Sequence, residues 1–232
     1  NMGELENMNH LLSAARGKYF TWQFDDDPCA PTFLNSVYSA LTKFDFPPAV
    51  FTSYCGIYGT NVHDFKNNDS AQPILLSGRE FLRAYLSGSL KTMGCCACYD
   101  LEYLKSLGGA RRLTNGPVAL HSEYLLVIQV GLLPNIAYVN TPLVATRVHE
   151  SSWTCSNDAD DLFKQAGVGL VKESMSVLSD DILKDDFYSN LVPVLRSVMS
   201  SVVVKDLTVN GRYDKKRIRE YVSTLEDEFL PL

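Results

Sequence analysis

The chain has 232 residues and a formal charge of −6, and 46% of its residues are hydrophobic while 21% are charged. This is the composition of an ordinary globular protein, long enough for one large domain or for a domain with an appendage. The acidic balance argues against a nucleic-acid partner, because no basic surplus is available to displace counterions from phosphates. The longest apolar run, Tyr124 to Ile136, is shorter than the roughly 20 residues that span a bilayer, so no membrane span is predicted.

Helical and strand patterns alternate along the first two thirds of the chain. Apolar residues recur at helical spacing in five stretches, which predicts helices at 4–16, 31–44, 77–86, 101–107 and 122–130. Runs rich in β-branched, aromatic or other apolar residues predict strands at 18–24, 49–58, 92–99, 135–139 and 143–148. Ser77 and Glu80 have the spacing of a capping box, and the polar stretch 59–72 predicts a loop or a hairpin region. The alternation of strands and helices indicates an α/β fold.

Beyond residue 160 the helical patterns dominate. We therefore expect a domain at 1–156 and a helical extension at 157–232. The extension could pack on the domain, bind a partner or mediate a homodimer, and the sequence leaves these alternatives open. A basic patch near the end favours a solvated face over a peripheral contact with an anionic membrane, and it consists of Lys215, Lys216, Arg217 and Arg219.

Six cysteines are present, and three of them, Cys95, Cys96 and Cys98, fall in the predicted strand 92–99. Structural zinc sites usually pair ligands two to four residues apart with a second pair elsewhere, and this spacing does not fit that pattern. In a strand, Cys96 and Cys98 would face one side and Cys95 the other. We expect buried reduced thiols here, which suits a reducing cytoplasm, and the N-terminus has no signal-peptide pattern.

The acidic triplet Asp25, Asp26 and Asp27 directly follows the predicted strand 18–24 and precedes Pro28. Adjacent carboxylates repel one another, and a divalent cation would relieve that repulsion. Mg²⁺ is usually held by one or two carboxylates together with substrate phosphates. The carboxyl end of a strand is also where open α/β sheets bind ligands. The triplet alone favours a metal–phosphate site and a solvated acidic turn about equally.

Two further polar features stand beside apolar elements. Glu123 lies in the first turn of the helix 122–130, where the helix dipole favours an acid, so capping alone explains it. Arg147 and His149 lie at the end of the strand 143–148, where a histidine by itself is more often a surface residue than a ligand. Taken singly, none of these residues indicates a functional site.

Taken in chain order, these features resemble family 2 glycosyltransferases. Six segments between residue 1 and about residue 155 carry the resemblance: Asn1-Met2-Gly3 with Asn9, Ala15 to Phe20, Asp25-Asp26-Asp27, Gly94 to Gly109, Ser122-Glu123-Tyr124, and Asn140 to Ser152. They are similar to the family's Asn-x-Gly-x5-Asn helix entry, Ala-x-Gly-x-Tyr strand entry, Asp-x-Asp motif, Gly-Gly ending, Glu-Asp-Tyr motif and Arg-x-His-x-x-Ser segment.

The resemblance implies a GT-A fold, a mixed sheet flanked by helices, with a nucleotide-diphosphate sugar as donor and a glycan or other hydroxyl acceptor. It implies an inverting transfer that depends on Mn²⁺ or Mg²⁺. Glu123 would be the general base, and Asp25 and Asp27, or Asp26 and Asp27, would hold the metal together with His149. Arg147 would contact the donor, as would the residues of the helix entry, Asn1, Gly3 and Asn9.

The resemblance also places Asn1 inside the family pattern. We therefore expect the opening strands of the nucleotide-binding region to be missing from this chain. A sheet without those strands would expose an edge, which a second copy of the chain could cover. The alternative to an active enzyme is a non-catalytic binding or scaffold domain derived from the same fold. A phosphotransfer enzyme ranks last, because no Gly-x4-Gly-Lys-Ser/Thr loop occurs.

Overall fold

The computed structural model describes residues 3–59, 61, 65, 71–116, 118–149, 160–178, 181–190, 215–216, 219–220 and 223. Within these residues the chain forms a five-stranded mixed sheet in the order β1-β4-β2-β5-β3. The strands are β1 (Tyr19–Phe20), β2 (Ala49–Tyr58), β3 (Ile74–Leu76), β4 (Ala97–Asp100) and β5 (Ile136–Val148). The long central strands β2 and β5 run parallel, while the other pairs are antiparallel. Their parallel pairing brings the carboxyl ends of β2 and β5 to one end of the sheet.

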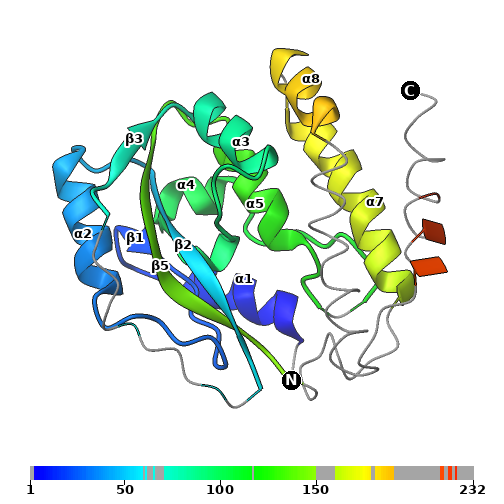
Figure 1. Ribbon diagram of the computed structural model, residues 1–232, viewed down its shortest axis with the longest axis horizontal. Coiled ribbons are helices and arrows are strands. Elements are labelled where there is room, and N and C mark those ends of the chain that lie inside the picture. The colour runs from blue at the N-terminus through cyan, green and yellow to red at the C-terminus, as the bar shows by residue number, and fades with distance from the viewer. Residues whose placement is uncertain are drawn as a thin grey trace.

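Helices cover both faces of the sheet (Figure 1). They are α1 (Glu4–Ala14), α2 (Phe33–Lys43), α3 (Gly78–Leu86), α4 (Leu101–Ser106), α5 (Ser122–Val130), α7 (Asp160–Val177) and α8 (Asp181–Ser189). One face is covered by α2, and the opposite face by α1, α3, α4 and α5, with α7 and α8 outside α3 and α5. The predicted α/β class, a mixed sheet flanked by helices, is confirmed.

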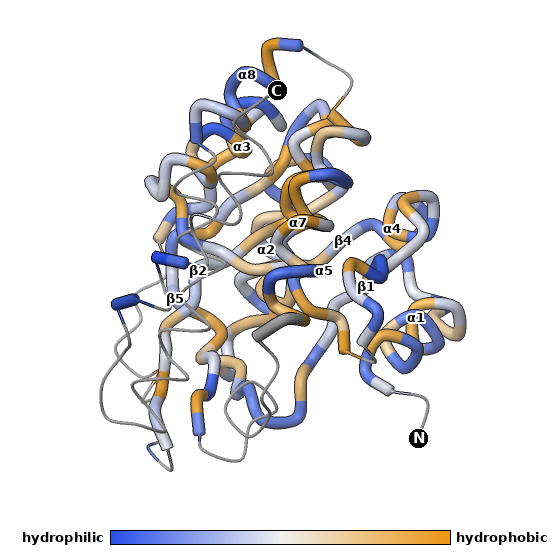
Figure 2. Tube along the Cα trace, turned by 90° about the vertical axis from the view of Figure 1, so that its right-hand side faces the viewer, coloured by the Kyte–Doolittle hydropathy of each residue, from blue (hydrophilic) through white to orange (hydrophobic). Residues whose placement is uncertain are grey.

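Each face of the sheet has its own apolar core. The core beneath α1, α3 and α5 includes a group of aromatic rings, in which Tyr99 packs edge-to-face on Trp22 and Phe51. The buried cysteines Cys95, Cys96 and Cys98 belong to the core beneath α2. In Figure 2 hydrophilic and hydrophobic segments alternate along α1, as expected for a helix that lies on a sheet with one side in solvent.

Several predicted boundaries are confirmed closely. Strand β2 has the predicted span 49–58, helix α5 the predicted span 122–130, and α3 begins after a capping box between Ser77 and Glu80. In these segments the local pattern and the tertiary environment favour the same structure. The side chain of Asp100 also caps α4 by accepting a hydrogen bond from the backbone N–H of Tyr103 at 3.0 Å.

Four of the five strand predictions need correction, and one strand was missed. The strand predicted at 18–24 ends at Phe20, because Trp22 turns into the core and donates from Nε1 to the carbonyl of Met8. The strands predicted at 135–139 and 143–148 are one continuous strand, β5. The edge strand β3, which follows the polar stretch 59–72, was not predicted. The strand predicted at 92–99 begins only at Ala97, since Gly94–Cys96 forms a 3₁₀ turn.

The expected state of the cysteines is mostly confirmed. Cys29, Cys55, Cys95, Cys96 and Cys98 are free thiols, and the last three are buried. The expectation that Cys95 and Cys96 lie in a strand is wrong, because both belong to the 3₁₀ turn. Their Sγ atoms lie 3.9 Å apart. Cys155 lies outside the described residues.

The predicted helices beyond residue 160 are present as α7 and α8, and residues 191–214 lie outside the described part. Both helices share one apolar cluster with α3 and α5, which includes Leu170 and Phe187. Two ion pairs add to the contact, Arg83–Asp186 and Arg111–Glu173. Of the basic patch, Lys215, Lys216 and Arg219 are exposed, and Lys216 pairs with Glu220, as expected for a solvated face.

Candidate functional site

The acidic triplet lies at the carboxyl end of the central strands. After Asp27 the chain runs antiparallel along β5, where Ala145 N–H donates to the carbonyl of Pro28 at 2.9 Å and Ala30 N–H to that of Leu143 at 2.8 Å. Pro28 has no N–H, so it suits this edge position, where only its carbonyl enters the ladder. This pairing places the triplet beside the last residues of β5, the position at which open α/β sheets bind their ligands.

Asp27 is fixed by a backbone contact from β5. The N–H of Arg147 donates to its Oδ1 at 2.7 Å. Burial raises the pKa of Asp27 to about 6, which the Arg147 N–H opposes and the charges of Asp26 and Asp25 increase. A carboxyl group in this state binds a cation readily, because the cation offsets both the lost solvation and the repulsion between the carboxylates.

The guanidinium of Arg147 holds loop backbone. Its Nε donates to the carbonyl of Asp26 at 3.2 Å, and one terminal nitrogen donates to the carbonyls of Gly59 at 2.7 Å and Asn61 at 3.0 Å. These bonds join the acidic triplet to the turn after β2. A contact between Arg147 and a donor remains a prediction, and in this arrangement the guanidinium is directed at backbone carbonyls.

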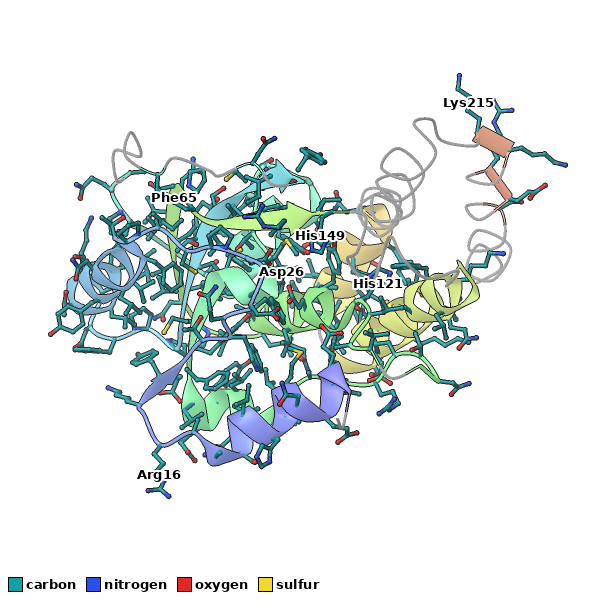
Figure 3. The ribbon with its side chains drawn as sticks, turned by 90° about the horizontal axis from the view of Figure 1, so that it is seen from below. Arg16, Asp26, Phe65, His121, His149 and Lys215 are labelled. Carbon is teal, nitrogen blue, oxygen red and sulfur yellow. The ribbon has the colours of Figure 1, made fainter. Side chains whose placement is uncertain are left out.

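His149 lies beside Asp26 of the acidic triplet, and Figure 3 labels both residues. The distance between His149 Nε2 and Asp26 Oδ2 is 3.5 Å, and both side chains are partly exposed. The structure therefore brings together two predicted metal ligands that are separated by more than a hundred residues. Arg16, labelled in the same view, lies away from this pair, just beyond the C-terminal end of α1.

The donor set fits a divalent metal in part. Among the described residues no group of three or more His, Cys, Asp or Glu side chains is arranged to hold a metal ion. Asp26 and His149 nevertheless form a pair, and Asp27 lies next to them. Such a set suits Mn²⁺ or Mg²⁺ bound jointly by protein and by substrate phosphates, since the phosphates supply the remaining oxygen ligands.

Glu123 lies at the start of α5, and its carboxylate is packed among protein atoms although part of the residue stays exposed. The backbone N–H of Cys95 donates to its Oε2 at 3.3 Å. Burial raises the pKa of Glu123 to about 7, the Cys95 N–H and thiol lower it, and the charges of Glu4 and Asp27 raise it further. The influence of Asp27 places Glu123 in the same region as the acidic triplet.

The predicted helix-entry residues have structural contacts. Asn1 lies outside the described residues, and Gly3 has a positive φ of 82° at the start of α1. Both ends of the Asn9 amide pair with the backbone of Ala110, which donates to Oδ1 at 2.9 Å and accepts from Nδ2 at 2.8 Å. Asn9 therefore fastens α1 to the segment after α4, and its contact with a donor remains a prediction.

Two residues near Glu123 had no predicted role. Cys95 is predicted to be a buried thiol in a strand, yet it lies in a turn and its backbone N–H donates to the Glu123 carboxylate. In the sequence, Gly94 is the only signal of that turn. His121 precedes α5 with a φ of 59°, and its ring contacts Tyr124 and Phe163. Burial lowers the pKa of His121 to about 4, so it is a neutral packing residue.

Comparison with known structures supports the class of fold that the sheet and helices define, a mixed α/β sheet flanked by helices. The structure is similar to S. aureus TarS 1-349, with a TM-score of 0.59, 13% sequence identity, and coverage of 97% of this chain and 59% of that one. TarS 1-349 in complex with UDP superposes less closely, with a TM-score of 0.48, 9% identity, and coverage of 92% and 73%.

At this level of identity the likeness concerns the fold alone. The chain spans 59% of the length of TarS 1-349. No protein-family model matches the sequence, and no curated protein matches it. Within the described residues no helix is long and apolar enough to cross a membrane.

Proposed function

We propose that this chain is the metal and acceptor side of a glycosyltransferase that moves a sugar from a nucleotide-diphosphate donor to a hydroxyl of a glycan or related acceptor. One observation carries the proposal. In a fold similar to that of TarS 1-349, Asp26 and His149 lie 3.5 Å apart at the carboxyl end of β2 and β5, and the charge of Asp27 acts on Glu123. Acidic groups with raised pKa values that gather at such a position are typical of a functional site.

Asp26, Asp27 and His149 would hold the divalent metal, Mn²⁺ or Mg²⁺. When bound, the metal would supply positive charge to the departing nucleotide diphosphate. Asp25 is exposed one residue before this set and would add to the negative field that attracts the cation. The Arg147 N–H keeps Asp27 oriented, and the Arg147 side chain keeps the turn after β2 against the triplet.

Glu123 would act as the general base. Its pKa of about 7 leaves a useful fraction ionised at neutral pH while keeping the carboxylate basic enough to take a proton from an acceptor hydroxyl. Loss of that proton makes the acceptor oxygen nucleophilic, and it would displace the nucleotide diphosphate directly from the anomeric carbon. A single displacement of this kind inverts the configuration at that carbon.

The first test measures ligand binding by thermal unfolding. TarS 1-349 has been crystallised with UDP and UDP-GlcNAc, so these are the first compounds to add, each with and without Mn²⁺. Binding to the native state should raise the melting temperature in the presence of metal, and Asp27→Ala should abolish the rise. Asp185→Asn, an exposed carboxylate on α8, is the control and should retain it. No rise with any common nucleotide diphosphate would exclude the donor site.

The second candidate is a non-catalytic binding or scaffold domain. The observation that favours it is the engagement of Asp27 and Arg147 with backbone groups, which stabilises the site without substrate. Sugar transfer and donor hydrolysis with Mn²⁺ separate the two candidates. An enzyme should turn over donor and lose this activity in Glu123→Gln, whereas a binding domain should bind the nucleotide without turnover.

A further inference from the structure

The 3₁₀ turn Gly94–Cys96 lies between β2 and the start of α5. From this turn the backbone N–H of Cys95 is directed at the carboxylate of Glu123, with 3.3 Å between N and Oε2. This is the single hydrogen bond from backbone to the Glu123 carboxylate within the described residues. The Cys95 thiol also interacts with this carboxylate, so the position of Cys95 as a whole bears on where the carboxylate lies.

Buried side chains fix the turn at both ends. The hydroxyl of Tyr99 donates to the carbonyl of Gly94 at 3.0 Å, and Thr52 Oγ1 donates to the carbonyl of Cys96 at 3.2 Å. Thr92 in turn donates to the carbonyl of Thr52 at 2.8 Å. All three donors are at least 96% buried, and a satisfied polar network inside a protein is rigid.

The ring of Tyr99 is itself held in place by its edge-to-face contacts with Trp22 and Phe51. Its hydroxyl therefore has little freedom to move away from the Gly94 carbonyl. The core beneath α1 and α5 is in this way linked to the turn, and through the turn to the carboxylate.

Gly94 permits the close approach of the turn to α5. A Cβ at this position would lie 2.9 Å from the Cβ of Glu123 and 3.1 Å from both its Cα and its carbonyl oxygen. These atoms belong to the helix backbone and to its first side-chain carbon, so they cannot move aside cheaply. Any larger residue at Gly94 would push the turn away from Glu123 and lengthen the hydrogen bond from Cys95.

We infer that Gly94 and Tyr99 are positioning residues for Glu123, because together they hold the Cys95 N–H against its carboxylate and so keep the base in one place for the acceptor hydroxyl. The inference rests on the proposed role of Glu123 as the base. A base that is displaced by about 1 Å can lose a hundredfold in rate, so the expected effect is on turnover rather than on donor binding.

The charged and titratable groups around Glu123 set the direction of the pH effect. They come from α1, the acidic triplet, α3, the 3₁₀ turn and β4, and they are Glu4, Asp27, Tyr85, Cys95 and Tyr99. The carboxylates among them disfavour the ionised form of Glu123, while the Cys95 N–H favours it. Weakening that hydrogen bond should therefore move the pKa of Glu123 above about 7.

The test compares Tyr99→Phe and Gly94→Ala with the unaltered chain. Two controls are matched to them. Tyr103→Phe removes a similar bond, from the Tyr103 hydroxyl to the Gln129 carbonyl near the other end of α5, and Gly56→Ala adds a Cβ in open space. We expect kcat at pH 7 to fall roughly tenfold in Tyr99→Phe and more in Gly94→Ala, with KM for the donor unchanged. The acidic limb of the pH–rate profile should shift upward, and the controls should match the unaltered chain.

A second readout does not depend on activity. Carbon NMR of chain labelled at glutamate carboxyl groups, with Glu123 assigned from Glu123→Gln, follows its titration directly. The inference is supported if the pKa of Glu123 rises in Tyr99→Phe and Gly94→Ala but not in Tyr103→Phe. It is overturned if the pKa is the same in all variants. Because Tyr99→Phe keeps the ring and its packing, it remains informative even if Gly94→Ala does not fold.

The two readouts also separate this inference from the proposed function. If Glu123→Gln retains turnover, Glu123 is not the base, and the inference that Gly94 and Tyr99 position a base is overturned together with it, whatever the NMR shows. If Glu123→Gln abolishes turnover while Tyr99→Phe and Gly94→Ala keep both kcat and the pKa, the proposed function stands and the positioning role alone is wrong.

Discussion

The burial of the Glu123 carboxyl group lowers the stability of the native protein whenever that group is ionised. Its carboxylate is buried, and its pKa of about 7 lies well above its usual range near 4.5. A carboxyl whose pKa is raised by folding stabilises the native state below its unfolded pKa, and this stabilisation is lost as pH rises through the folded pKa. For Glu123 the loss takes place between about pH 4.5 and pH 7. Above that range the protein holds an ionised carboxylate in a site that disfavours it.

We therefore expect Glu123→Gln to stabilise the protein at pH 8 and to leave its stability unchanged at pH 4.5. The gain should be about 2 kcal/mol, because each unit of pKa shift corresponds to about 1.4 kcal/mol and the site is only partly closed to solvent. Glutamine keeps the acceptor for the Cys95 N–H and cannot ionise. Urea unfolding at the two pH values measures the difference. Equal stability of the two proteins at pH 8 would show that the carboxylate is not desolvated.

The same measurement bears on function. A substitution that stabilises the fold while it removes turnover identifies a residue kept for chemistry rather than for packing. The ionised carboxylate of Asp27 should also lower the stability of the native protein, since its pKa is raised as well, to about 6. Together with Asp26, these residues supply the acidic groups that the proposed function requires.

At the scale of elements, the helix α7 approaches the loop after α4 more closely than most side chains allow. A Cβ at Gly169 would lie 2.7 Å from the carbonyl oxygen of Leu113 and 3.2 Å from its Cβ. Glycine in a helix interior is usually a weakness that alanine relieves. Here the close packing of α7 reverses that expectation.

We predict that Gly169→Ala destabilises the protein by about 1–3 kcal/mol, although the same change in an open helix would stabilise it by about 1 kcal/mol. The control is Gly56→Ala, where no atom lies within 4 Å of the added Cβ and the stability should change little. Denaturant unfolding of both variants measures the contrast. A stabilised Gly169→Ala would mean that α7 is not packed on Leu113.

At the scale of the whole molecule, the helices predicted as an extension share a core with the domain. Phe187 of α8 is fully buried in one apolar cluster with residues of α3, α5 and α7. The two-part division at residue 157 remains a prediction. The shared cluster, however, gives a reason for α7 and α8 to unfold together with the sheet.

We expect Phe187→Ala to lower the stability of the whole chain by about 3–5 kcal/mol and to leave a single unfolding transition. Far-UV circular dichroism follows the helices, and fluorescence of the buried Trp22 follows the core beneath α1 in a Trp153→Phe background. The two signals should shift together. An early loss of helix with Trp22 still buried would instead define the extension as an independent unit.

The local sequence pattern predicted the secondary structure correctly wherever the tertiary environment favours the same conformation as the residues themselves. Strand β2 and helix α5 have their predicted spans, and the capping box at Ser77 begins α3. The acidic triplet and Glu123 became candidate site residues only through the resemblance to a glycosyltransferase family, because each of them has a structural explanation when taken singly. Whether they lie near one another is a property of the tertiary structure.

Local pattern failed where long-range pairing decides the conformation. The sequence predicted two strands, 135–139 and 143–148, yet β5 continues through Pro142 between them. There β2 has an irregular register at Ser53, which accommodates a residue without an N–H. The cysteine pair looked like a strand, yet Gly94 and Cys95 form a turn because Tyr99, Thr52 and the start of α5 hold them there.

The sequence by itself therefore determined the α/β class and the position of most helices, since these depend on periodicity and side-chain type, whereas the acid–base and metal roles remain predictions from the resemblance. Only the tertiary structure decided that Asp26 and His149 meet, that Arg147 holds loop backbone, and that the turn at Gly94 holds Glu123. The physical reason is that these contacts join residues that are 28 to 123 positions apart, so no local pattern in the sequence predicts them. Their geometry is set by the pairing of β2 with β5 and by the packing of α5 on the sheet.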